Sequence, residues 1–191
     1  MFGQKRGASG IAKSAVALAI ALALTSCSKN VSDDDYSGTP PATDAADVSD
    51  QEIYASLTES YSAYLKVADQ ILTDGGKSPE RIRSVSTEAF ASSFAADAEE
   101  YASANLRSVG STAAKTLELQ SWTRQSNAFN VTAYVCDDVS GIDVLNGDGS
   151  TVVSPDRDPT TPYEVSFEGD SIDQLLVSSK TLWTGTDFCD E

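Results

Sequence analysis

The sequence predicts an α+β domain in which N-terminal helices pack on one face of a curved antiparallel sheet. From residue 49 to about residue 110, apolar residues recur at helical spacing. Beyond that point they alternate with polar residues, as in half-buried strands. Because helices followed by a run of strands are typical of α+β folds, residues 49–191 are expected to form one domain.

The first helix is expected to begin at Ser49 and to end at the Asp-Gly-Gly segment 74–76. Ser49 and Glu52 form a capping box, and Val48 and Ile53 are placed for a hydrophobic staple. An apolar stripe follows at helical spacing: Ile53, Leu57, Tyr61, Tyr64, Leu65, Ala68, Ile71 and Leu72. This stripe should bury the helix against the sheet.

Two further helices are expected before the strands. Ser78 would cap a short one, with Pro79 at the first position, where its missing N–H costs nothing. A third should run from about Ser86 to near Gly110. One side of it is apolar: Phe90, Phe94, Ala98, Tyr101, Ala102 and Leu106. We interpret most of these aromatic side chains as core.

Four segments alternate or cluster apolar residues as strands do. Residues 117–120, 129–135 and 163–168 alternate apolar with polar side chains, and residues 172–183 predict a further strand. The segment 146–149 (NGDG) between Val144 and Val152 predicts a hairpin turn. Antiparallel pairing of these strands would give the sheet.

Residues 1–26 have the form of a lipoprotein signal peptide. Lys5, Arg6 and Lys13 precede an uncharged apolar run at residues 14–25. Because a transmembrane helix needs about 20 apolar residues, this run is expected to be a signal-peptide core. Residues 24–27 (LTSC) resemble a lipobox, which predicts cleavage before Cys27 and two acyl chains on it. The alternative is an ordinary secretory peptide with a chance cysteine.

Residues 27–48 are expected to form a tether. They are rich in Ser, Asp, Pro and Ala and carry few large apolar side chains, so they cannot offset their own ordering entropy. A flexible chain of this length reaches roughly 25 Å. The expected location is the outer face of the cell membrane, where lipid alone makes the membrane contact.

The chain is strongly acidic, with 13 basic and 29 acidic residues. Removal of the three signal-peptide bases would leave 10 against 29, a net charge near −19. Such a surface repels phosphate, which excludes nucleic acid as a favoured partner. A basic protein would be attracted, although acidity also serves solubility alone.

Cys136 and Cys189 are expected to form a disulfide, because Cys27 is the lipid site and an exported protein meets oxidising conditions. The closed loop of about 50 residues would stabilise the fold by about 4 kcal/mol in the chain-entropy model. The alternatives are two reduced thiols or a metal pair. The chain contains no histidine and no CxxC pair, which disfavours zinc and thiol chemistry.

The order of elements resembles the cystatin-like, cone-shaped fold of the nuclear transport factor two and ketosteroid isomerase superfamily. Residues 134–144 (YVCDDVSGIDV), 148–149 (DG), 162–165 (PYEV), 182–183 (LW) and 188–189 (FC) are similar to secreted lipoproteins of high-GC Gram-positive bacteria. The resemblance covers about residues 49–189. It implies a pocket between the sheet and the helices, and it implies no reaction.

Catalytic members of that superfamily pair a carboxylate base with an aspartic acid or tyrosine donor. Tyr134, Asp137 and Asp138 are expected to line the pocket here, and Asp143 is a further candidate, but none matches a catalytic motif. No catalytic residue, cofactor or metal site is therefore predicted. The segment 146–150 is superficially like a calcium loop, yet Arg157 occupies the twelfth position, where a carboxylate is required.

The predicted function is a non-catalytic binding or interaction domain. Its ligand would be a small apolar molecule or a basic protein. The alternative is a cone-fold enzyme of the isomerase, cyclase or hydrolase type that acts on a small apolar molecule.

Overall fold

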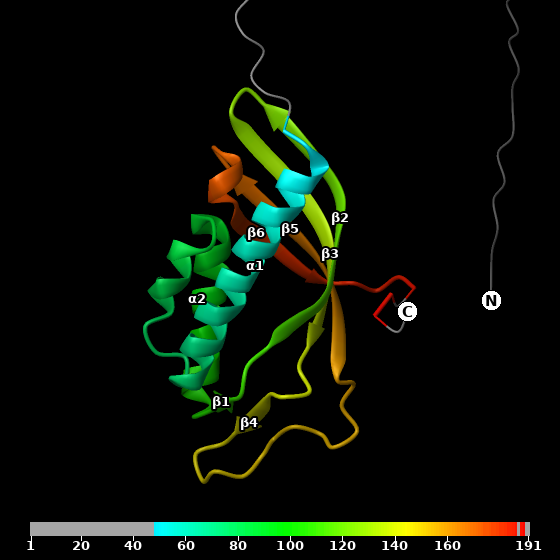
Figure 1. The fold of residues 1–191 in the computed structure, drawn as a ribbon. Helices are drawn as coiled ribbons and strands as arrows, with labels where there is room; N and C mark the ends of the chain where they lie inside the picture. Colours follow the sequence, from blue (N-terminus) through cyan, green and yellow to red (C-terminus); the bar gives the residue numbers. More distant parts are fainter. Residues whose placement is uncertain (1–47, 187, 190–191) are drawn as a thin grey trace, which may run out of the picture. The chain divides into compact units, whose positions relative to one another are not determined.

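The computed structural model describes residues 48–186, 188 and 189 (Figure 1). The predicted signal peptide, the lipidation site Cys27 and the tether up to residue 47 lie outside the described residues. The elements follow in the order α1 (Asp50–Thr73), η1 (Pro79–Ser84), α2 (Glu88–Ser103), β1 (Arg107–Val109), β2 (Ala113–Gln125), β3 (Ala128–Asp138), β4 (Asp143–Leu145), β5 (Thr160–Gly169), η2 (Ile172–Gln174) and β6 (Leu176–Leu182).

The predicted fold class is confirmed: helices precede a curved antiparallel sheet and pack on one of its faces (Figure 1). The main sheet has the order β2-β3-β5-β6, with every neighbouring pair antiparallel. A smaller sheet pairs β1 with β4. We call the helix-covered face of the main sheet its inner face and the opposite one its outer face. No helix among the described residues is both long and apolar enough to cross a membrane.

The limits of α1 agree with the sequence prediction. The Ser49 hydroxyl accepts from the Glu52 N–H, and the Glu52 carboxylate accepts from the Ser49 N–H at 2.9 Å, which completes the capping box. At the other end, Gly75 and Gly76 adopt φ values of 72° and 76° and donate to Leu72 and Ile71. This Schellman arrangement needs left-handed backbone, which glycine adopts without strain.

The starts of the next two helices differ from the prediction. Ser78 precedes η1 with a left-handed φ of 53°, and its side chain makes no capping hydrogen bond. Thr87, rather than Ser86, caps α2 by accepting from the Phe90 N–H. Ser86 is instead buried, with its hydroxyl donating to Ile82 and its backbone bridging to β6. The reason is tertiary, since contact with β6 holds this residue in extended conformation.

Helix α2 ends at Ser103, before the predicted limit near Gly110. Asn105 takes a φ of 54°, and the N–H groups of Asn105 and Leu106 bond back to Ala102 and Tyr101 in a second Schellman arrangement. Residues 107–109 then pair with β4. The predicted strand over residues 172–183 likewise begins late, because residues 172–174 form the 3₁₀ turn η2.

The core lies between the inner face and the helices. The stripe predicted for α1 packs on alternate residues of β3, β5 and β6. These strand residues are Phe129, Val131, Ala133, Val135, Val165, Phe167 and Val177. The core therefore fills much of the space between sheet and helices where a pocket was predicted.

Candidate functional site

The three predicted pocket residues do not share one pocket. Strand β3 alternates its side chains, so Asp137 follows Val135 on the inner face and is 1% exposed. Tyr134 and Asp138 point to the outer face. Hydrogen bonds from the Ser140 hydroxyl and N–H lower the pKa of Asp138, which keeps it ionised. Asp143 lies in β4, outside the main sheet.

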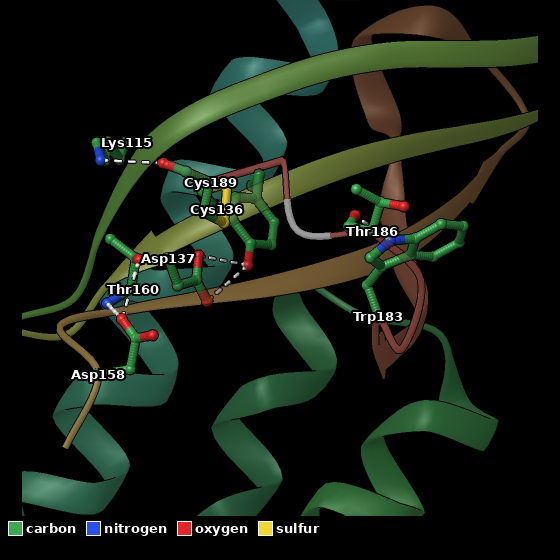
Figure 2. Close-up of a disulfide and its surroundings, with 9 residues drawn as sticks. Lys115, Cys136, Asp137, Asp158, Thr160, Trp183, Thr186 and Cys189 are labelled. Atoms are coloured by element: carbon green, nitrogen blue, oxygen red, sulfur yellow. Dashed lines mark hydrogen bonds between the residues drawn. A yellow bond between two sulfur atoms is a disulfide. The ribbon is translucent and has the colours of Figure 1, made fainter. Parts of the chain in front are cut away.

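The C-terminal segment from Trp183 to Cys189 crosses the outer face and covers Tyr134. The Tyr134 ring lies 4.6 Å from the Trp183 ring and 5.3 Å from the Phe188 ring, measured between centroids. The predicted disulfide between Cys136 and Cys189 is present and fastens this segment to β3 (Figure 2). Lys115 adds a 3.1 Å hydrogen bond to the Cys189 carbonyl. We call residues 183–189 the C-terminal strap.

Asp137 forms a buried polar network on the inner face. The Tyr61 hydroxyl from α1 lies 2.9 and 3.0 Å from the two carboxylate oxygens. The Lys180 ammonium from β6 lies 2.6 Å from Oδ2 in an ion pair. The Lys180 side chain is 15% exposed and that of Asp137 is 2% exposed. Such a pair needs good geometry and a further hydrogen bond to offset desolvation, and Tyr61 supplies that bond.

Aromatic rings surround the ammonium. Its Nζ lies 4.1 Å from the centre of the Tyr163 ring and 5.6 to 5.7 Å from the rings of Tyr64 and Tyr61. These distances allow cation–π attraction, which strengthens away from water. Burial first, and then the negative charge of Asp137, raise the pKa of all three tyrosine hydroxyls well above or beyond the usual value.

The raised tyrosine pKa values predict alkaline unfolding. Above the ordinary tyrosine pKa of 10.0, the unfolded chain releases phenolic protons that the native Tyr61 and Tyr64 retain. Their contribution to stability is complete below pH 10 and is lost as pH rises, at about 1.4 kcal/mol per pH unit for each tyrosine. Circular dichroism and tyrosinate absorbance should change together in one transition. Tyr61→Phe should reduce the slope, and tyrosinate formation in a folded domain would contradict the prediction.

A groove opens beside this network between α2 and the sheet, with a volume of about 370 Å³. Lys180 and Tyr163 contribute from the sheet, Tyr64 from α1, and aromatic and small residues from α2. We call it the α2 groove. Its lining residues are Tyr64, Leu72, Phe90, Ser93, Phe94, Asp97, Ala98, Tyr101, Tyr163 and Lys180. A concave, aromatic-lined site with few polar groups is the usual form of a small-molecule pocket.

Other features favour structure over chemistry. No group of three metal-ligating side chains occurs in the described part of the chain. Asn146 accepts from the N–H groups of Asp148 and Ser150, which makes the segment 146–150 a turn. Arg157 donates to the carbonyls of Val139 and Ile142 and so holds the preceding loop.

A second depression is acidic. It lies between α1, the end of β5 and η2, and no lysine or arginine is among its described lining residues. Its carboxylates are Glu59, Glu168, Asp170 and Asp173. This surface is where the predicted attraction for a basic protein would be strongest.

Sequence reasoning missed Lys180 and the polar role of Tyr61. Tyr61 was assigned to the core stripe, and its ring is indeed packed against Phe167 in edge-to-face contact. Its hydroxyl, however, reaches a charge 76 positions away. No local pattern indicates that Asp137, Tyr61 and Lys180 meet, because each comes from a different element.

No family model and no curated protein matches this chain. Two solved structures are similar to it at low level. The crystal structure of the intermembrane space region of chloroplast protein ARC6 has a TM-score of 0.48 and 12% identity, and covers 67% of this chain and 94% of its own. The solution structure of a de novo β-sheet design has a TM-score of 0.27 and 17% identity, and covers 72% of this chain and 96% of its own.

Proposed function

We propose that this protein is an extracytoplasmic lipoprotein whose domain binds a small apolar molecule in the α2 groove without catalysis. The anchor rests on the lipobox-like residues 24–27 and the apolar run before them. The binding role rests on the groove and on the state of Asp137 beside it. The resemblance to cone-fold proteins with a pocket between sheet and helices agrees with this proposal.

The occupied carboxylate of Asp137 carries the choice between binding and catalysis. A general base needs a carboxylate within reach of substrate, with an oxygen free to take a proton. Asp137 is buried, Tyr61 donates to it and Lys180 neutralises it. Asp137 therefore supports a structural role for the network, which orders Lys180 and Tyr64 at the base of the groove.

Closing the groove should abolish binding. Ser93 is exposed on α2 and lines the groove, so Ser93→Trp would fill its mouth without disturbing the core. With 2-ethylnaphthalene as an apolar probe, we expect the wild type in lipid nanodiscs to show saturable amide chemical-shift changes in α2 and β6. Ser93→Trp should lose them.

The matched control is Ser92→Trp. Ser92 is also exposed on α2, is absent from the lining of the groove, and bonds to its own helix at Glu88. This variant should bind the probe as the wild type does. Empty nanodiscs give the background from lipid partition. Equal binding by both tryptophan variants would place the site elsewhere and reject the groove.

Lipid attachment should depend on Cys27 alone. Cys27→Ser is expected to leave the protein uncut or shed, because the thiol that carries the acyl chains is gone. Phase partition in detergent measures this change, with the wild type in the detergent phase. Cys189→Ser is the matched control, since it removes a cysteine without touching the anchor. Wild-type protein recovered unmodified in the aqueous phase would contradict the assignment.

A further inference from the structure

Lys180 gives the α2 groove a polar requirement. An ammonium carries three N–H donors, and among the described residues Asp137 provides the acceptor oxygen for it. The rings of Tyr163, Tyr64 and Tyr61 approach its other sides and offer π faces rather than lone pairs. The side chain also lines the groove. A ligand oxygen that enters there would accept a charge-assisted hydrogen bond that these rings do not replace.

Charge decides which oxygen fits. Asp137 already balances Lys180, so a ligand carboxylate would bring an uncompensated negative charge into a half-buried site. Asp97 also lines the groove, and the whole chain has a net charge of −16. Both terms oppose an anion. A neutral acceptor meets the ammonium without this penalty.

The shape of the lining selects the rest of the ligand. Phe90 and Phe94 come from α2, and Tyr163 faces them from β5. Flat aromatic walls on both sides favour a planar apolar body, which they contact over both of its surfaces. The volume of about 370 Å³ accommodates a small bicyclic or tricyclic molecule.

We propose that the α2 groove binds neutral planar compounds that carry a carbonyl oxygen, and that Lys180 donates to this oxygen. The inference rests on the proposed binding function and deepens it by naming the ligand class. Lys180 is a specificity-determining residue in this scheme, and Asp137 is a positioning residue that fixes the ammonium.

Three matched probes test the inference on the full processed chain in lipid nanodiscs. They are 2-acetylnaphthalene, which has a neutral carbonyl, 2-ethylnaphthalene, which lacks oxygen, and 2-naphthoate, which is an anion. Dissociation constants come from amide shifts in α2 and β6. We expect the ketone to bind at least about tenfold more tightly than the hydrocarbon, the margin that a hydrogen bond to a charged donor supplies. Naphthoate should bind more weakly than the ketone.

The variant that isolates the donor is the double change Asp137→Asn and Lys180→Met. It removes both charges together, so no unpaired charge remains in the core, and Tyr61 keeps an acceptor in the asparagine oxygen. The ketone preference should disappear while the hydrocarbon still binds. Lys115→Met is the matched control, because Lys115 bonds the C-terminal strap instead. It should retain the preference.

The outcomes separate this inference from the binding function. Equal affinity for ketone and hydrocarbon in the wild type overturns the carbonyl assignment and leaves apolar binding intact. Tighter binding of naphthoate overturns it in favour of an anion site. A ketone preference that survives in the double variant removes Lys180 from the assignment. Failure of all three probes to bind rejects the proposed function together with the inference.

Discussion

Lys180→Met is expected to lower the free energy of unfolding by about 3–5 kcal/mol, the cost of leaving one partner of a buried ion pair alone. Asp137 would keep the Tyr61 hydrogen bond but lose its only counter-charge among the described contacts, while its side chain is 2% exposed. For a domain of this size, the melting temperature should fall by roughly 10 °C or more. Thermal and urea unfolding followed by circular dichroism measure the loss.

The double variant separates charge from packing. If the cost comes from an unpaired carboxylate, Asp137→Asn combined with Lys180→Met should be much more stable than Lys180→Met alone. Lys115→Met should stay close to wild type, because its ammonium bonds a single carbonyl near the surface of the strap. A Lys180→Met protein within about 1 kcal/mol of wild type would show that water reaches Asp137 and would refute the buried network.

Removal of the disulfide is expected to cost about 4 kcal/mol, because the bridge joins residues 53 positions apart. Cys136→Ser combined with Cys189→Ser should therefore lower the melting temperature by several degrees or more. The sheet and helices should remain, since the core between them lies on the other face. Reduction of the wild type should reproduce the loss.

Fluorescence tests whether the bridge holds the C-terminal strap. In a Trp122→Phe background Trp183 is the remaining tryptophan, as the chain contains two. Its ring packs on Tyr134 while the bridge is intact. Loss of the bridge should release it to water and shift its emission to the red. An unchanged spectrum together with an unchanged melting temperature would mean that the aromatic contacts alone fasten the strap.

The sequence predicted the fold class and most element limits because these depend on local chemistry. A capping box at Ser49 and the Gly75 and Gly76 pair fix the two ends of α1 without reference to the rest of the chain. Alternation in β3 and β5 depends only on the two-residue period of a strand. The disulfide also followed from the sequence alone, since two cysteines remained after Cys27 was assigned to lipid.

Limits set by tertiary contact could not be predicted. Ser86 has the chemistry of a helix cap, yet its backbone pairs with Val177 of β6 and Thr87 becomes the cap. Residues 107–109 continue the polar and apolar spacing of the preceding helix, yet they pair with β4. In both places a partner far along the sequence outweighs the local preference.

The candidate site depends most on tertiary structure, and a single irregularity in β6 explains why. Counting by twos from the buried Val177 would place Ser179 inside and Lys180 outside. Ser166 pairs with Ser179, whereas the next residue, Phe167, pairs with Val177, so Ser178 is an extra residue in the ladder. This bulge reverses the alternation and turns Lys180 inward beside Val165. Residue patterns thus determined the elements and their buried faces, but the register of β6 brought Lys180 to Asp137, because strand pairing is fixed only when the whole sheet closes on its core.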